Sequence, residues 1–179
     1  MDSQDQALSH LLVKERLHEL EMAYCRGVDR RDATLLQSIF FEDAIEEHGD
    51  MYKGSAIEFV RWAIETFLPQ YEATTHYVLN EWYRVDGERA EGETHRISYH
   101  RQRHEDGKLF ETLAACRTFN RYECRDGDWR IAYRGVARDW VTQRQADEAL
   151  YTGKFGMPLS RPDADDLSYR LLTLFPRSR

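Results

Sequence analysis

Three side chains in this sequence are suited to proton transfer, and two of them occupy unusual positions. His76 stands near the start of a strand-like run, Thr75-His76-Tyr77-Val78-Leu79-Asn80. Asp29 follows the last turn of a long helical pattern, where a carboxylate opposes the helix dipole at a cost of roughly 0.3–1 kcal/mol. Such a placement indicates a use elsewhere, for example pairing with a histidine. The simpler alternatives are a structural histidine and a solvated or capping loop acid.

Tyr24 is the third candidate. It lies on the apolar side of the same helical pattern, about one turn before Asp29. A tyrosine there either packs in the core or presents its phenol to a pocket. On a regular strand, alternation puts His76, Asn80 and Trp82 on one face, which makes Asn80 a candidate substrate contact.

Two arginines and a tryptophan on the later strand-like segments are further candidate substrate contacts. Arg117 shares a strand face with Phe119, and Arg138 shares one with Trp140. An arginine on the inner wall of a curved sheet must be paired or must bind an anion. The alternative is an exposed outer face with salt bridges, which contribute little to stability.

The sequence offers no signal for a metal or a cofactor. His95 and His100 have opposite parity on one strand and therefore face opposite ways. No HxH or HExxH spacing occurs, and no GxGxxG, GxxxxGKS/T or GxSxG motif. The cysteines are odd in number and have no CxxC spacing, which does not suit a disulfide framework. We expect neither a metal nor a cofactor.

The composition excludes other classes of protein. The chain has 179 residues and a mass of 21.2 kDa, which suits one domain. Its formal net charge of −7 argues against binding to nucleic acid or to an anionic membrane. The apolar runs are too short to span a membrane, and the acidic N-terminus does not resemble a secretory signal. We therefore expect a soluble cytoplasmic protein.

Helical patterns dominate the first part of the chain. Apolar residues recur at helical spacing over residues 6–28, and Gly27 together with the polar cluster after it is expected to end this helix. Asp32 is a plausible cap of a second helix that includes Ile39 and Phe40. Residues 44–47 and 51–53 suit a short hairpin, and Ser55 caps a third helix over residues 56–67.

The second part of the chain reads as a sheet. Asp-Gly pairs at 86–87, 106–107 and 126–127 recur at equal spacing between strand-like runs, and this dipeptide favours tight hairpin turns. They predict four antiparallel strands over residues 75–85, 88–104, 108–125 and 128–141. Strands this long must curve, with Gly92 and Gly135 as candidate bends. The pattern predicts an α+β domain in which helices cover the concave face of a bent sheet, while residues 143–151 suit a further helix.

Several of these segments together resemble the SnoaL-like group of the nuclear transport factor 2-like superfamily, over about residues 6–142. The segments are Tyr24-Cys25-Arg26-Gly27-Val28-Asp29, Asp43-Ala44, Tyr52-Lys53-Gly54, Thr75-His76-Tyr77-Val78-Leu79-Asn80 and Arg125-Asp126-Gly127-Asp128-Trp129-Arg130-Ile131. The resemblance implies a cone-shaped α+β barrel with N-terminal helices inside a strongly bent antiparallel sheet around a mostly apolar pocket. The barrel would occupy residues 1–142, and residues 143–179 would pack on it or on a neighbouring subunit.

The resemblance also implies a function. In several enzymes of this group, of the scytalone dehydratase, bile-acid dehydratase and hexachlorocyclohexane dehydrochlorinase type, an Asp–His pair matches Asp29 and His76. Tyr24 matches a tyrosine of the bile-acid dehydratase, whose last-strand arginine corresponds to Arg138. The implied activity is that of a cofactor-free lyase, acting as a homotrimer on a hydrophobic aromatic or polycyclic alcohol by elimination of water or release of a small aldehyde. The alternatives are a ketosteroid-isomerase-like enzyme and a non-catalytic ligand-binding or scaffold subunit, such as the small subunit of a ring-hydroxylating dioxygenase.

Overall fold

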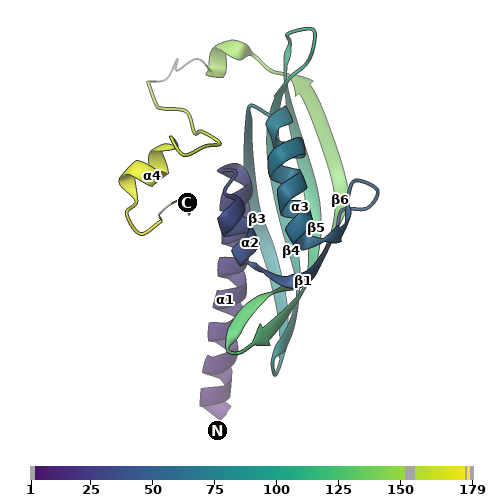
Figure 1. Ribbon diagram of the computed structural model, residues 1–179, viewed down its shortest axis with the longest axis vertical. Coiled ribbons are helices and arrows are strands. Elements are labelled where there is room, and N and C mark those ends of the chain that lie inside the picture. Colours follow the sequence, from purple (N-terminus) through teal and green to yellow (C-terminus); the bar gives the residue numbers. More distant parts are fainter. Residues whose placement is uncertain (1–2, 152–155, 176, 178–179) are drawn as a thin grey trace.

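The computed structural model describes residues 3–151, 156–175 and 177. The chain begins with helices and continues into long strands, as the sequence predicts (Figure 1). The helical elements are α1 (Ser3–Asp29), α2 (Ala33–Ser38), α3 (Ala56–Trp62), a π-helical segment (Ala63–Phe67), 3₁₀ turns (Leu68–Gln70 and Glu148–Tyr151) and α4 (Leu167–Leu171). Within the described residues, no helix combines the length and the apolar character that a membrane span requires.

The strands form one curved, mixed sheet that is not closed. Its members are β1 (Phe40–Glu47), β2 (Lys53–Ser55), β3 (Ala73–Asp86), β4 (Arg89–Arg103), β5 (Leu109–Arg125) and β6 (Asp128–Gln145). The order across the sheet is β2-β1-β6-β5-β4-β3. All neighbours are antiparallel except β1 and β6, which run parallel, so the prediction of a purely antiparallel sheet is wrong at this one pairing.

The three Asp-Gly turns are confirmed as the hairpins of the sheet. Gly87, Gly107 and Gly127 have φ values of 58°, 81° and 82°, in the left-handed region that favours glycine. The strands that they join are paired on both sides of each turn. Gly92 has a different role, because a Cβ there would lie 2.6 Å from the Tyr83 ring.

Some predicted boundaries are wrong. α1 ends at Asp29, at the start of the polar cluster predicted to end it. Gly27 lies inside the helix, where the missing side chain lets Leu36 of α2 approach, since a Cβ would lie 2.6 Å from Leu36 Cγ. Phe40 belongs to β1 rather than to the second helix. The predicted helix over residues 143–151 is replaced by the end of β6 and a 3₁₀ turn. β6 extends beyond residue 142, to Gln145.

The helices pack on one side of the sheet, here called the inner face. α1 lies along β3, and α3 lies against β1 (Figure 1). Side chains from both layers form the buried core, including Leu17, Leu20, Leu36, Phe40, Val60, Tyr122 and Ile131. Burial of this apolar surface is the main favourable contribution to folding, at about 25 cal/mol per Å².

The segment after β6 returns to the end of α1. The Arg30 guanidinium lies 3.2 Å from the Asp166 carboxylate, and the Tyr169 hydroxyl lies 3.4 Å from Asp32. The Arg26 guanidinium lies over the rings of Tyr169 and Phe175. In Figure 1, α4 accordingly lies beside α2 and the end of α1.

Candidate active site

The end of α1 and the start of β3 bring Asp29 and His76 together. His76 Nδ1 lies 2.7 Å from Asp29 Oδ1, and the backbone N–H of His76 donates to Asp29 Oδ2 at 2.8 Å. The Thr74 hydroxyl donates to Oδ1 at 3.0 Å. Three donors thus hold one carboxylate. Asp29 comes from the predicted helix and His76 from the predicted strand.

Burial and hydrogen bonding act in opposite directions on Asp29. Burial alone raises the pKa of this carboxyl, but the hydrogen bonds from His76 and Thr74 and the charge of His76 outweigh it. The pKa of Asp29 therefore lies below its ordinary value. Asp29 is an ionised acceptor at neutral pH, which favours the tautomer of neutral His76 with the proton on Nδ1.

A second histidine lies against the pair. The His100 ring meets the His76 ring edge-on, with 5.5 Å between centroids, and Tyr71 covers His100 at 4.8 Å. Burial, together with the charge of a protonated His76, lowers the pKa of His100 to about 4. His100 is therefore uncharged at neutral pH.

Aromatic rings continue from this histidine towards α3. Tyr71, Phe67, Trp62 and Phe59 follow one another with centroid distances of 5.3, 5.3 and 5.8 Å. His48 stacks on Phe59 at 4.9 Å at the far end. The helical segment therefore contributes a row of packed aromatic rings, here called the aromatic wall, of which Phe59 is buried in the core.

The sheet side is different, because it carries buried charge. Tyr24 of α1 lies between two guanidiniums, with 4.5 Å from Arg96 and 3.9 Å from Arg134 to its ring centroid. Burial raises the pKa of the Tyr24 phenol; the negative charge of Glu46 adds to this effect and the positive charge of Arg134 opposes it. The phenol is therefore protonated at neutral pH and can donate a hydrogen bond.

One carboxylate holds this cluster together. Glu21 is fully buried and bonds to Arg96, and its Oε1 lies 2.9 Å from Arg134 Nη2. The Tyr122 hydroxyl donates to the same oxygen at 2.7 Å. Burial and the repulsion by Arg134 lower the pKa of Arg96. The inner face of the sheet therefore carries a buried ion cluster against α1.

Two β-bulges decide where the other predicted contacts lie. A register shift between Val78 and Glu81 turns Glu81 inward, so Asn80 and Trp82 are exposed and do not share the face of His76. A second shift opposite Ala115 and Cys116 separates Arg138, which pairs with Cys116, from Trp140, which pairs with Ala115. The expectation that each set shares one face is therefore wrong, because a bulge reverses the alternation.

Arg117 also lies away from the dyad. It alternates with the buried inner residues Thr118 and Asn120 and therefore points to the outer face. There it pairs with Asp139 at 3.1 Å and approaches Glu93 at 3.8 Å. Arg117 thus fits the alternative given in the sequence analysis, an outer face with salt bridges. Arg138 pairs with a residue of the inner face, but its own position is exposed.

Sequence reasoning missed the charged residues of the interior. Glu21 falls on the apolar stripe of α1, between Leu17 and Tyr24, and a charge on that stripe is the signal that could have revealed it. Arg96 shares the inner face of β4 with Thr94 and Ser98, and this parity is the signal that could have placed it inside. Arg134 gives no such signal, because the face on which it lies depends on a bulge in β6.

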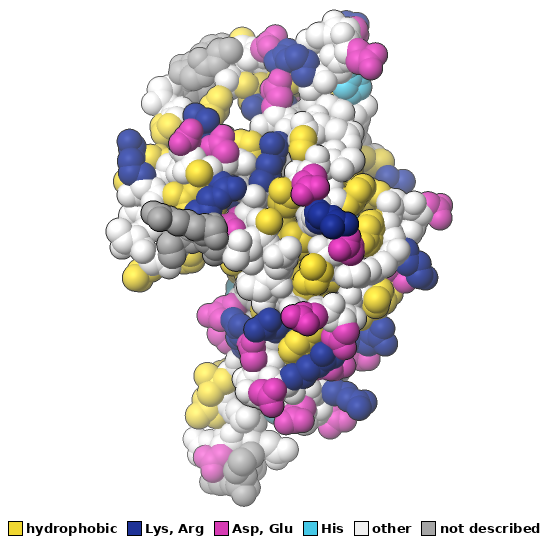
Figure 2. All heavy atoms as spheres, in the orientation of Figure 1, with side chains coloured by type: hydrophobic (Ala, Val, Ile, Leu, Met, Phe, Trp, Pro, Cys, Tyr) yellow, Lys and Arg dark blue, Asp and Glu magenta, His cyan; other side chains and the backbone are white. Residues whose placement is uncertain are grey.

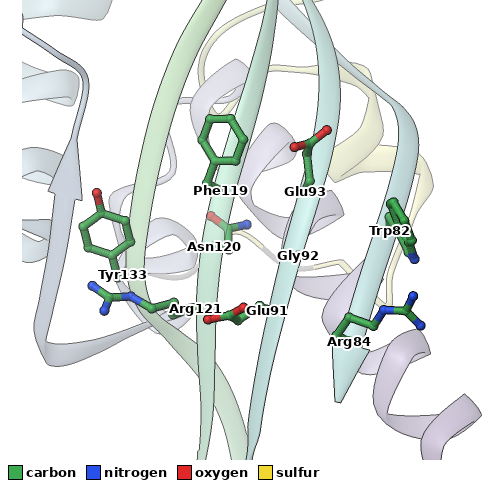
Figure 3. Close-up of a pocket in the computed structure, with 9 residues that line it drawn as sticks. All are labelled: Trp82, Arg84, Glu91, Gly92, Glu93, Phe119, Asn120, Arg121 and Tyr133. Atoms are coloured by element: carbon green, nitrogen blue, oxygen red, sulfur yellow. The ribbon is translucent and has the colours of Figure 1, made fainter. Parts of the chain in front are cut away.

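The outer face of the sheet carries a shallow hollow of about 460 Å³. Figure 3 shows its aromatic and charged rim, formed by Trp82, Arg84, Glu91, Glu93, Phe119, Arg121 and Tyr133. On the face of the molecule seen in Figure 2, acidic and basic side chains are interspersed rather than separated into regions of one sign. Among the residues that the structure describes, no group of three His, Cys, Asp or Glu side chains could hold a metal ion.

Helices packed inside a curved six-stranded mixed sheet define the nuclear transport factor 2-like class of α+β cone folds. Within that class, this chain belongs to the SnoaL-like family, whose domain profile matches residues 9–135. A search among curated proteins finds no significant match.

Solved structures share the fold at low sequence identity. A type 2 hexachlorocyclohexane dehydrochlorinase (LinA) is 22% identical, with a TM-score of 0.70, and the match covers 87% of this chain and 98% of that chain. The LinA-type3 enzyme of Novosphingobium barchaimii is 21% identical, with a TM-score of 0.70 and coverage of 77% and 94%. A scytalone dehydratase-like protein of Novosphingobium aromaticivorans is 15% identical, with a TM-score of 0.68 and coverage of 79% and 93%. At these identities the likeness establishes the fold.

Proposed function

We propose that this chain is a cofactor-independent lyase in which His76 removes a proton from a small organic alcohol. The observation that carries the proposal is the 2.7 Å contact between His76 Nδ1 and Asp29 Oδ1. A carboxylate on Nδ1 leaves Nε2 with its lone pair, which is the arrangement of a general base, and it stabilises the imidazolium that forms. The fold likeness to a dehydrochlorinase and a scytalone dehydratase-like protein supports the same class of reaction.

The surroundings of His76 suit a transient positive charge. Asp29 is ionised and fixed by two further donors, the His76 backbone N–H and the Thr74 hydroxyl, so it does not have to reorient during the reaction. His100 stays neutral near pH 7 because its pKa is about 4, and it adds no second charge beside the imidazolium.

An elimination by this apparatus balances without a cofactor. The proton on carbon passes to His76 Nε2, and the electrons of the C–H bond form the new double bond as the neighbouring C–O bond breaks. The leaving hydroxide takes the proton of the imidazolium, either directly or through the Tyr24 phenol, and departs as water, which restores neutral His76. Arg134 Nη1, which has no hydrogen-bond partner among the described residues, is the donor proposed for the departing oxygen. In the variant that releases a small aldehyde, His76 Nε2 takes the proton of the hydroxyl group and the O–H electrons form the C=O bond as the C–C bond breaks. The carbanion that remains then takes this proton back from the imidazolium.

The aromatic wall favours a ring-containing substrate. Phe67, Trp62 and Phe59 follow one another from Tyr71, beside His100, towards His48. Flat rings stack well against such side chains. We therefore propose an aromatic or polycyclic alcohol as the substrate.

The test is turnover of β-hydroxytetralone to naphthol and water, followed by the absorbance of the product, in wild type and in His76→Ala. We expect the variant to lose turnover and to keep a melting temperature close to that of wild type. His95→Ala is the matched control, because His95 lies on β4 with an exposed side chain. A well-folded His76→Ala protein that keeps full turnover would remove the dyad from the mechanism. Absence of turnover in wild type, with β-hydroxytetralone and with hexachlorocyclohexane, would favour a non-catalytic binding subunit.

A further inference from the structure

Two oppositely charged groups on neighbouring strands each keep one polar atom unpaired in the interior. Glu46 of β1 is fully buried; its Oε1 lies 2.7 Å from His48 Nε2, and its Oε2 has no hydrogen-bond partner among the described residues. Arg134 of β6 is also fully buried. Its Nε donates to Asn120 and its Nη2 to Glu21, while its Nη1 has no partner in the described part of the chain.

The two groups lie at the same position of the sheet. Glu46 and Arg134 are direct partners in the parallel register of β1 and β6, and both side chains are on the inner face. The Arg134 guanidinium covers the Tyr24 ring at 3.9 Å, and the charge of Glu46 acts on the same phenol. Glu46, Arg134 and Tyr24 therefore form one corner of the interior, next to the helix that carries Asp29.

Leaving these atoms unpaired is costly. A buried donor or acceptor without a partner loses its hydration without compensation, and the loss is larger for charged groups. A single ligand oxygen can satisfy both atoms only if it also carries a hydrogen, since Glu46 Oε2 needs a donor and Arg134 Nη1 needs an acceptor. A hydroxyl group meets both requirements, whereas a ketone oxygen meets only the second.

The charges of the cluster also favour a hydroxyl group as the ligand. Two arginines alone would suggest a site for an anion. Here Glu21 and Glu46 balance Arg96 and Arg134, so a carboxylate ligand would find no net positive charge and would be repelled by Glu46. A neutral polar group suits this corner better than an ion.

We propose that Glu46 and Arg134 together bind the hydroxyl group of an alcohol ligand, with Glu46 accepting its hydrogen and Arg134 donating to its oxygen. The inference rests on the proposed function, because it identifies the part of the site that selects an alcohol. The Arg134 guanidinium lies over the Tyr24 ring at 3.9 Å, so Tyr24 borders the same corner.

Binding of three compounds with the same ring system tests this: tetralol, tetralone and tetrahydronaphthoate, measured by calorimetry without turnover. We expect wild type to bind tetralol about tenfold more tightly than tetralone, which corresponds to one hydrogen bond to a charged group, and tetrahydronaphthoate least tightly. Glu46→Gln should abolish the preference for tetralol, because the amide can donate to the ketone. Glu47→Gln is the matched control: its side chain pairs with Lys53 and Tyr133, and we expect the wild-type preference to remain.

A crystal structure of wild type with tetralol gives a second measurement that needs no variant. We expect the hydroxyl oxygen within hydrogen-bond distance of both Glu46 Oε2 and Arg134 Nη1. In the calorimetry, the proposal is overturned if Glu46→Gln keeps the preference for tetralol or if no compound binds at millimolar concentration. In the crystal structure, it is overturned if the hydroxyl oxygen lies elsewhere or if only a water occupies this corner. His76→Ala separates this inference from the proposed function: it should lose turnover and keep the preference for tetralol, and turnover in that variant would overturn only the lyase.

Discussion

Asp29 bonds to His76 at two places, the ring Nδ1 through Oδ1 and the backbone N–H through Oδ2. The carboxylate therefore fixes both the orientation of the imidazole and the position of the strand that carries it. Asp29 is the last residue of α1, and His76 lies near the start of β3, the edge strand of the sheet. The contact therefore also joins the helical layer to the sheet. A change at Asp29 should affect stability as well as catalysis.

We expect Asp29→Asn to lower kcat by several powers of ten, since the comparable change in serine proteases costs about 10⁴ by favouring the wrong tautomer. It should also lower the free energy of unfolding by about 1–3 kcal/mol, because three donors lose a charged acceptor. Turnover and urea unfolding of the single variants and of Asp29→Asn/His76→Ala check this. The double variant should be hardly slower than His76→Ala alone, because residues that act as a unit are not additive. Additive losses would contradict the prediction.

Gly27→Ala should destabilise the protein although alanine is the better helix former. In an open helix this change stabilises by about 1 kcal/mol. Here the new Cβ would lie 2.6 Å from Leu36 Cγ, in the contact between α1 and α2. We expect a lower melting temperature. Leu36→Ala is itself destabilising because Leu36 is buried, but Gly27→Ala should cost less in the Leu36→Ala background than in wild type, since the smaller side chain leaves room for the Cβ. A stabilised single variant would show that the helices move apart at no cost.

The fold was largely predictable because its strongest signals are local. The Asp-Gly turns and the helical spacing of α1 depend on a few neighbouring residues, and they fixed the order of elements and the pairing of β3 to β6. The pairing of Asp29 with His76 was predictable from two unusual placements and a family resemblance. The positions of Asn80, Trp82 and Trp140 were not, because a bulge depends on packing across strands and leaves no local pattern.

Acidic conditions should destabilise the protein through His100. An unfolded histidine binds a proton near pH 6.5, whereas burial and His76 hold the folded pKa of His100 at about 4. Between these values the unfolded state carries more protons, so the free energy of unfolding falls as the pH decreases, by on the order of 3 kcal/mol in total, and His100 causes no further loss below pH 4. Asp29, whose folded pKa is lowered, adds a loss only below its unfolded pKa of 3.8.

Urea unfolding at a series of pH values checks this, with His100→Gln and His95→Gln compared with wild type. We expect the His100 variant to show a flatter profile between pH 6.5 and 4. His95→Gln, on the same strand, is the matched control for the substitution. Equal slopes in wild type and the His100 variant would mean that the buried ring is not the group that senses the pH.

The chain should assemble through the outer face of the sheet. Trp82, Phe119 and Trp140 are exposed there by 67%, 36% and 47%, and large exposed aromatic side chains are typical of interfaces. The family resemblance favours a trimer. Light scattering at micromolar concentration should give three times the mass of the 21.2 kDa chain, and Trp82→Glu should reduce it to one chain. Met51→Glu, at an exposed position in the turn between β1 and β2, should leave the mass unchanged.

The Glu21 cluster should be the most sensitive part of the interior. Glu21→Gln would leave Arg96 and Arg134 as two buried cations within reach of the Tyr24 ring and without their shared carboxylate. Removing one partner of a buried ion pair typically costs about 3–5 kcal/mol, because the remaining charge is neither hydrated nor compensated. We expect a loss of that size in the free energy of unfolding.

Glu19→Gln is the matched control two residues earlier on α1. Glu19 is exposed and pairs only with Arg16 at 3.2 Å in the described part of the chain, so its replacement should change the free energy of unfolding by less than about 0.5 kcal/mol. Urea unfolding of both variants gives the comparison, provided that the m-values agree with wild type. Equal, small effects at Glu21 and Glu19 would mean that the arginines find other partners, and that the cluster contributes less to the fold than its burial indicates.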